Sequence, residues 1–320
     1  MTDIIQIEGL RKKYGRLVAV DNLTLSVAPG AIYGFVGPNG AGKTSTMRML
    51  TTLMKPTAGN AWIAGYSIRK QQREVRRAIG YMPDFFGVYD DMTVWEYLDF
   101  FGACYEIPEV QRVSINHDLL ELVDLMHRRD DMVETLSRGM KQRLALARTL
   151  AHDPQVLILD EPASGLDPRA RVEIRELLVE LARMGKTIFF STHILADVAE
   201  ICTHVGIVEA GRLVASGTLE EMQRNLMPHR RVRITVRGDL DLAEKLLRAV
   251  AGVVSVERGT SASGSDANEH TLQVDISSDD LDVSDILTEL VQQGMRVVHF
   301  TEDTRDMEAI FMRATKGIVS

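Results

Sequence analysis

The sequence predicts an α/β protein with a mostly parallel, doubly wound core sheet, followed by a small α+β domain of ferredoxin-like type. Three continuous apolar runs of strand length, at residues 31–36, 156–159 and 187–190, are typical of strands buried on both faces. Stretches with helical periodicity separate these runs, and such alternation favours a parallel sheet. Because the pattern changes after residue 225, we expect one domain over residues 1–225 and a second over residues 226–320.

Short alternating strands open the chain. Ile5 and Ile7 are apolar while Gln6 and Glu8 are polar, and residues 23–27 alternate in the same way. Such alternation is typical of strands with one exposed face. It predicts an antiparallel β part at the N-terminus, beside the parallel core.

Helices dominate the middle of the chain. Thr93 and Glu96 have the spacing of a capping box at the start of a helix. Apolar residues at helical spacing predict further helices at about residues 115–126 and 137–150. These helices form an expected insertion at about residues 85–150, between strands of the core.

Strands and helices of the second domain alternate over shorter distances. We expect strands at residues 231–236, 253–256, 272–276 and 295–300, and helices at residues 240–250, 283–292 and 304–314. A segment rich in Gly, Ser and Ala at residues 259–268 predicts a flexible loop. The order of elements suggests a ferredoxin-like arrangement.

Composition excludes several classes of protein. The chain has 320 residues, enough for two domains, and its formal net charge of -8 argues against nucleic acid as the main partner. Two cysteines without a CxxC pair exclude a disulfide-rich secreted scaffold. We find neither a signal peptide nor an apolar run of about 18 residues. The sequence therefore predicts no transmembrane segment.

A glycine-rich loop follows the first apolar run. Residues 37–44 read GPNGAGKT and fit the pattern GxxxxGK[ST], between a predicted strand and a predicted helix. Backbone N–H groups of such a loop surround phosphates, the lysine reaches the β- and γ-phosphates, and the hydroxyl binds Mg²⁺. The candidate ATP-binding residues are Gly37, Pro38, Asn39, Gly40, Ala41, Gly42, Lys43, Thr44 and Ser45.

Two carboxylates end the second apolar run. Asp160 can hold Mg²⁺, and Glu161 can orient and deprotonate an attacking water. His193 ends the third run, so it should lie at the same sheet edge. An acidic turn exposed to solvent and a structural histidine are the alternative interpretations, and the nearby phosphate loop weighs against the first.

Over about residues 4–219, the sequence resembles the ABC ATPase family. Residues 136–143 (LSRGMKQR) resemble the family signature, and residues 164–167 (SGLD) resemble its D-loop. Tyr14 stands where the family has an aromatic residue that stacks on adenine, and His193 matches the switch histidine. These motifs occur in the family's order.

The resemblance implies an ATPase that works in pairs. Ser137 of the signature would face the γ-phosphate of the ATP bound by the opposite subunit, in a homodimer or heterodimer. Gly139 of the signature and Asp167 of the D-loop are further candidate ATP-binding residues. The resemblance further implies a separate transmembrane permease, a peripheral place on the cytoplasmic face of the membrane, and the drug-resistance, polysaccharide and lipid exporter subclass. The alternative function is that of a soluble ABC ATPase in translation or DNA maintenance.

The sequence departs from the family pattern at two motifs. Arg138 replaces a glycine and Met140 the glutamine of the usual LSGGQ signature. Asp84 occupies the place of the Q-loop glutamine and is a candidate metal ligand, since a carboxylate can meet Mg²⁺. The aromatic residues within 85–89 either pack against the helical insertion or form a docking surface for the permease.

Overall fold

The structure is a computed structural model that describes residues 3–85, 87, 91–226, 229–259, 269–277, 282–302 and 307–315. The chain divides into two compact units, the first of Met1–Leu219 with Ala314–Ser320 and the second of Glu220–Arg313. The boundary that the sequence predicts, after residue 225, lies within helix α8 (Leu219–Leu226).

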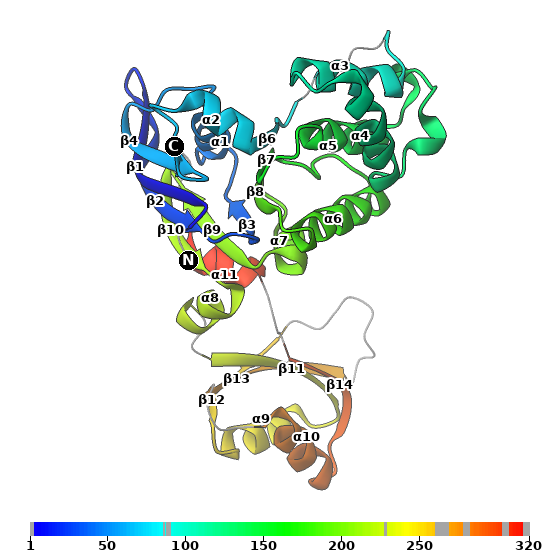
Figure 1. Ribbon diagram of the computed structural model, residues 1–320. Helices are drawn as coiled ribbons and strands as arrows, with labels where there is room; N and C mark the ends of the chain where they lie inside the picture. The colour runs from blue at the N-terminus through cyan, green and yellow to red at the C-terminus, as the bar shows by residue number, and fades with distance from the viewer. Residues whose placement is uncertain are drawn as a thin grey trace. The chain divides into compact units, whose positions relative to one another are not determined.

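The first unit contains two sheets (Figure 1). One is antiparallel, with the strand order β2 (Leu17–Val27), β1 (Ile5–Tyr14), β4 (Ala58–Ile63) and β5 (Tyr66–Ser67). The other has the strand order β10 (Arg212–Gly217), β9 (His204–Glu209), β3 (Ile32–Val36), β8 (Thr187–Thr192), β7 (Val156–Asp160) and β6 (Ile79–Met82). Neighbouring strands of this second sheet pair in parallel from β9 to β6, whereas β10 pairs antiparallel with β9.

In the described part of the first unit, seven α-helices connect these strands. They are α1 (Lys43–Leu50), α2 (Gln72–Ala78), α3 (Val94–Cys104), α4 (Glu109–Leu122), α5 (Arg138–Leu150), α6 (Pro168–Arg183) and α7 (Leu195–Ile201). The 3₁₀ turns η1 (Met126–Arg128) and η2 (Val133–Thr135) lie between α4 and α5. The insertion between β6 and β7 is therefore helical. None of the helices in the described part of the chain has the length and apolar character that crossing a bilayer requires.

The expected bounds of the second insertion helix were wrong. We expected a helix at residues 115–126, whereas α4 begins at Glu109, after Pro108, and ends at Leu122. Val110 and Val113 in its first turns are exposed, so apolar spacing does not mark where the helix starts. Pro108 is the N-cap residue, directly before the first turn, and a proline there marks the start of the helix better than apolar spacing does.

Both faces of the parallel sheet are covered, because side chains alternate along each strand. Tyr33, Phe35 and Phe189 belong to a core that includes α1 and the antiparallel sheet. Ile188 and Phe190 point the other way, into a core that includes helices α3 to α6. Figure 1 shows α1 between the two sheets and the insertion helices on the opposite side of the parallel strands. Because β3, β8, β7 and β6 are parallel, their carboxyl ends lie at the same edge of the sheet.

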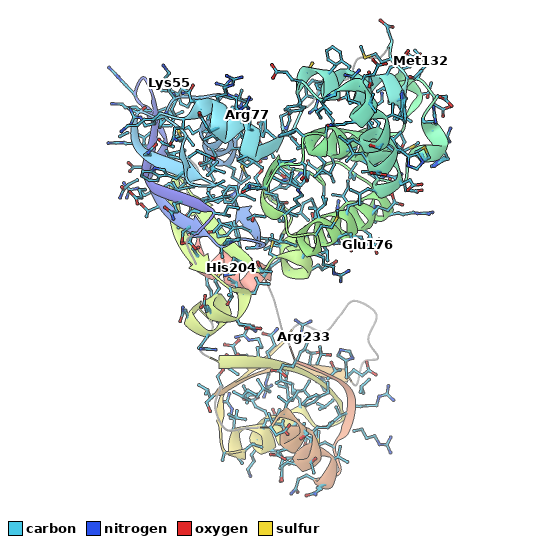
Figure 2. The ribbon with its side chains drawn as sticks, in the orientation of Figure 1. Lys55, Arg77, Met132, Glu176, His204 and Arg233 are labelled. Carbon is cyan, nitrogen blue, oxygen red and sulfur yellow. The ribbon has the colours of Figure 1, made fainter. Side chains whose placement is uncertain are left out.

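The second unit has the ferredoxin-like arrangement. Its elements follow in the order β11 (His229–Arg237), α9 (Leu240–Ala249), β12 (Val253–Arg258), β13 (Glu269–Ser277), α10 (Val283–Gln292) and β14 (Arg296–Glu302). The antiparallel sheet has the order β12-β13-β11-β14, and both helices cover one face of it (Figure 1). Side chains fill the space between helices and sheet (Figure 2). Helix α11 (Met307–Ala314) follows. Most of the loop expected at 259–268 lies outside the described residues.

Candidate functional site

Glycines fix the path of the loop between β3 and α1. A side chain on Gly37 would collide with the carbonyl oxygen of Val208. Gly42 has a φ of +96, in the left-handed region, and a side chain there would collide with the carbonyl oxygen of Ala19. Only glycine suits both positions. The loop thus leads directly into the N-terminus of α1, where backbone N–H groups favour an anion.

Lys43 places its ammonium group inside the loop. The side chain is buried, and Nζ donates hydrogen bonds to the carbonyl oxygens of Gly37 at 2.7 Å and Pro38 at 3.3 Å. Nζ also lies 3.4 Å from Oε1 of Glu161, at the end of a different strand. A buried cation therefore joins the loop to the carboxyl end of β7.

The two carboxylates after β7 have different surroundings. Asp160 is 1% exposed; its Oδ1 accepts a hydrogen bond from Ser191 Oγ at 2.5 Å, and its buried Oδ2 has no hydrogen-bond partner among the described residues. Glu161 has a φ of 52, and its backbone N–H donates to the carbonyl oxygen of Ser191 at 3.2 Å. Asp160 thus has one carboxylate oxygen available to a ligand, whereas the carboxylate of Glu161 faces the ammonium group of Lys43.

His193 contacts Glu161 from the end of β8. Its Nδ1 lies 2.8 Å from Glu161 Oε2, and the imidazole is 47% exposed. Because an ionised carboxylate can only accept, Nδ1 carries the hydrogen in this contact. The structure therefore brings together Lys43, Glu161 and His193, three residues from separate parts of the sequence.

The signature and D-loop residues lie at the starts of two helices. Ser137 caps α5 by accepting a hydrogen bond from the N–H of Met140 at 3.3 Å, and Asp167 caps α6 by accepting one from the N–H of Ala170 at 3.0 Å. A side chain on Gly139 would come within 2.9 Å of Ala170 Cβ. Ser137 and Asp167 are exposed, and within the described residues no hydrogen bond or ion pair joins them to the Lys43 group.

Three further predicted residues are at the surface. Thr44 and Asp84 are exposed, and Tyr14 is 42% exposed, with Lys12 Nζ 5.1 Å from its ring centroid.

The negative charges of Asp160 and Asp84 both act on the side chain of Tyr81, in β6. Burial raises the pKa of Tyr81 to about 12, and the negative charge of Asp160 and, more weakly, that of Asp84 add to the increase. Of the aromatic segment at 85–89, only Phe85 and Gly87 are described, and Phe85 is 87% exposed.

Two supporting residues were missed by the sequence analysis. Gln142 is buried in α5 and donates to the carbonyl oxygen of Pro162 at 2.6 Å, directly after the carboxylate pair. Ser191 contacts both carboxylate residues. Strand pairing is the signal that could have found Ser191, since it lies opposite Asp160 on the neighbouring parallel strand.

The fold and the site together define a P-loop nucleoside triphosphatase. A glycine-rich loop leads from a buried strand into a helix, its lysine points inward, and an acidic pair ends a strand of the same sheet. This is the context in which such a loop binds nucleotide phosphates. The helical insertion, together with Ser137 at the start of α5 and Asp167 at the start of α6, favours the ABC ATPases within this class.

Comparison with known proteins identifies the family. The ABC transporter family model matches residues 20–164. The Nod factor export ATP-binding protein I of Cupriavidus metallidurans is 42% identical over 69% of this chain and 73% of that protein. The linearmycin resistance ATP-binding protein LnrL of Bacillus subtilis is 30% identical over 98% of both chains. A solved ATP-binding subunit of an ABC transporter is 30% identical, with a TM-score of 0.63, over 69% of this chain and 92% of that one.

The chain therefore belongs to the ABC transporter ATP-binding proteins. It binds ATP and hydrolyses it to power transport. The relatives favour this function over the alternative, a soluble ABC ATPase in translation or DNA maintenance. The fold agrees with the α/β class, parallel core and antiparallel N-terminal part that the sequence predicts.

Proposed function

We propose that this chain is the ATPase of an exporter and acts on a separate transmembrane permease at the cytoplasmic face of the membrane. The observation that carries this proposal is the similarity to the linearmycin resistance protein, because it covers 98% of both chains and so includes the second unit. The Nod factor relative, whose name specifies export, supports the same direction. We also propose that residues 1–225 form the ATPase domain and residues 226–320 an accessory domain.

For ATP, we assign the phosphates to the loop and the N-terminus of α1. The buried ammonium group of Lys43 supports this assignment, since it can exchange its carbonyl partners for phosphate oxygens. Tyr14 is the proposed adenine-stacking residue, and its partly exposed ring supports that role. The other proposed contacts are Gly37, Pro38, Asn39, Gly40, Ala41, Gly42, Thr44 and Ser45.

Asp160, Thr44 and Asp84 are the proposed Mg²⁺ ligands. The unpaired, buried Oδ2 of Asp160 fits a hard cation, which takes oxygen ligands. Thr44 follows the loop lysine, and Asp84 follows β6, the neighbour of β7. A magnesium ion held there neutralises negative charge on the phosphate oxygens during transfer.

Hydrolysis follows from the proton acceptor at Glu161. Its carboxylate takes a proton from water as the water oxygen attacks the γ-phosphorus, and the bond from that phosphorus to the bridging oxygen breaks, giving ADP and phosphate. His193 holds the carboxylate by its Nδ1–H contact at 2.8 Å. Lys43 stabilises the negative charge that develops on the transferred group.

A second copy or a related ATPase would complete the site. Ser137, Gly139 and Asp167 lie at exposed helix starts, where backbone N–H groups and the helix dipole favour a phosphate. We propose that they contact the ATP held by the opposite subunit. ATP would then stabilise the closed dimer, and hydrolysis would allow it to open.

The test is a pull-down of tagged Glu161→Gln protein from detergent-solubilised native membranes, with ATP and Mg²⁺. The variant should accumulate as an ATP-bound dimer, because it binds ATP without an efficient base. We expect a multi-span membrane protein in nearly equal amount, and a weaker yield in the matched sample without nucleotide. Recovery of ribosomal or chromosomal material alone, with no membrane protein, would contradict the exporter proposal.

A further inference from the structure

One buried hydroxyl contacts both members of the carboxylate pair. Ser191 on β8 is the register partner of Asp160 on β7, and the two residues are 0% and 1% exposed. Ser191 Oγ donates to Asp160 Oδ1 at 2.5 Å and accepts the backbone N–H of Glu161 at 3.1 Å. A hydroxyl has one hydrogen and two lone pairs, so this group can make both contacts at once.

The hydroxyl determines which oxygen of Asp160 is available. Oδ1 is occupied by Ser191, while Oδ2 is buried without a partner among the described residues. Rotation of the carboxylate would break the hydrogen bond to Ser191, and a buried polar atom left unpaired is costly. Ser191 therefore holds Asp160 with its free oxygen in one direction.

The same residue holds the backbone of Glu161. Glu161 has a φ of 52, in the left-handed region that residues other than glycine rarely adopt. Its N–H donates to both the carbonyl oxygen and Oγ of Ser191, at 3.2 Å and 3.1 Å. This conformation directs the Glu161 side chain to Lys43 and His193.

We propose that Ser191 is a positioning residue for ATP hydrolysis, which orients Asp160 toward Mg²⁺ and Glu161 toward water. The inference rests on the proposed function, because it takes Asp160 as a metal ligand and Glu161 as the base. Thr192 is the matched control. It is also buried, at 3% exposure, but its Oγ1 accepts from the N–H of Ile194 and contacts neither carboxylate residue.

The test measures the Mg²⁺ concentration for half-maximal hydrolysis of radiolabelled ATP by the purified full-length chain. Ser191→Ala should raise that concentration about tenfold and lower the turnover rate about tenfold, in the range for residues that support metal ligands. Affinity for a fluorescent ATP analogue in EDTA should stay at the wild-type value, whereas the melting temperature should fall, because Asp160 Oδ1 loses its buried partner. Thr192→Val also removes a buried hydroxyl and should lower the melting temperature, but it should leave the Mg²⁺ requirement, the turnover rate and the metal-free ATP affinity unchanged.

Asp160→Asn separates this inference from the proposed function. If Asp160→Asn raises the Mg²⁺ requirement and Ser191→Ala does not, the role of Ser191 is overturned and the metal assignment stands. If neither variant changes the requirement, both are overturned. A loss of metal-free ATP affinity or of melting temperature in Ser191→Ala, with an unchanged Mg²⁺ requirement, would show that Ser191 only supports packing.

Discussion

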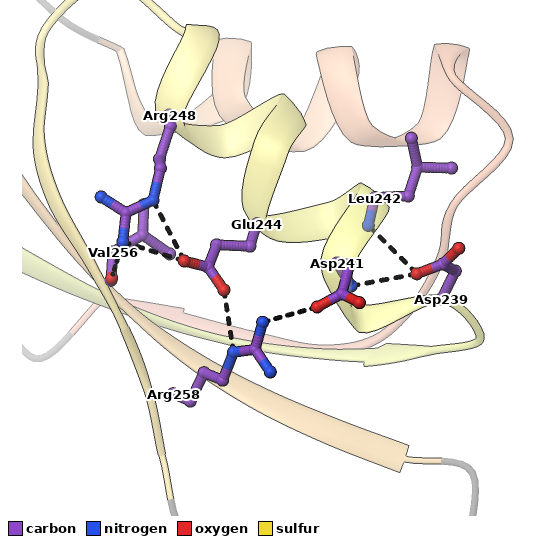
Figure 3. A network of polar contacts seen from close by, with 7 residues as sticks. All are labelled: Asp239, Asp241, Leu242, Glu244, Arg248, Val256 and Arg258. Atoms are coloured by element: carbon purple, nitrogen blue, oxygen red, sulfur yellow. Dashed lines mark hydrogen bonds and ion pairs between the residues drawn. The ribbon is translucent and has the colours of Figure 1, made fainter.

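Two polar clusters, one in each unit, have similar distances and different surroundings. In the first unit, the carboxylate cluster comprises Lys43, Asp160, Glu161, Ser191 and His193, with contacts of 2.5 to 3.4 Å. In the second, the α9–β12 network comprises Asp239, Asp241, Glu244, Arg248 and Arg258 (Figure 3), and its ion pairs measure 2.5 to 2.9 Å. Judged by contact distances alone, the second cluster would be as good a candidate functional site as the first.

Exposure distinguishes Asp160 from the ion pairs of the α9–β12 network. Asp160 is 1% exposed, whereas the side chains of Asp241 and Arg258 are 83% and 55% exposed. Water and salt weaken exposed ion pairs, while a low dielectric strengthens buried ones and penalises unpaired groups. In the α9–β12 network, Arg258 pairs with Asp241 and Glu244 and so joins β12 to α9, Arg248 pairs with Glu244, and Asp239 caps α9. The carboxylate cluster leaves one buried oxygen unpaired, and this unpaired atom points to function.

The largest effect should come from Glu161→Gln. Glutamine keeps the shape but cannot accept a proton, and general base catalysis contributes roughly 10² to 10⁴ in rate. Phosphate release should fall by about that factor while ATP binding is retained. Glu176→Gln is the control, because Glu176 is exposed on α6 (Figure 2) and is not one of the cluster residues. An unaltered turnover rate in Glu161→Gln would count against its role as the base.

Asp84→Asn tests whether the metal shell extends to an exposed carboxylate. The variant should lower Mg²⁺-dependent turnover about tenfold, in the range for groups around a metal, and weaken ATP binding less, because an amide is a poorer metal ligand. Both quantities can be measured with the purified chain. Asp91→Asn, an exposed aspartate in the same β6–α3 connection, should behave as wild type. Unchanged hydrolysis in Asp84→Asn would remove Asp84 from the metal shell.

The sequence predicted the loop, the carboxylate pair and the order of elements, because each depends on local pattern. Continuous apolar runs marked β3, β7 and β8, and α10 begins and ends at the predicted residues 283–292. Ser191 was missed because its role depends on pairing between strands that are distant in sequence. The contact of Arg138 with the D-loop was missed because it depends on how the start of α5 lies against a loop 26 residues further along the chain: its Nη2 donates to the carbonyl oxygen of Ser164 at 3.2 Å.

Gly165→Ala asks whether this exposed arginine contact behaves like the surface network. Gly165 has a φ of +66, and a side chain there would collide with the guanidinium group of Arg138. The left-handed backbone alone should cost about 1 kcal/mol of unfolding free energy, measured by chemical denaturation. Gly185→Ala is the control, since its φ is +89 and its Cβ would meet open space. Equal losses would show that Arg138 moves aside freely, and a larger loss at Gly165 would show that the guanidinium is held in place.

The smallest effect should come from the α9–β12 network, as a change in pH dependence. Hydrogen bonds from Arg258 and Arg248 lower the pKa of Glu244 from its ordinary value of 4.5. A carboxylate with a lowered folded-state pKa contributes stability above the unfolded value and loses it as the pH falls through the folded value. Wild-type protein should therefore lose slightly more melting temperature than Glu244→Gln between about pH 7 and about pH 3.

Glu257→Gln on β12 is the matched control for this titration. Glu257 is exposed, and its side chain makes no hydrogen bond or ion pair with another described residue, so Glu257→Gln controls for the loss of one carboxylate from β12 without loss of an arginine contact. The melting temperature of Gly165→Ala gives the scale for this comparison. If Glu244→Gln and wild type differ in their acid-induced loss of melting temperature by as much as Gly165→Ala lowers it, water does not weaken the ion pairs of the α9–β12 network. The contrast between the two clusters would then have to come from what each one binds, and not from burial.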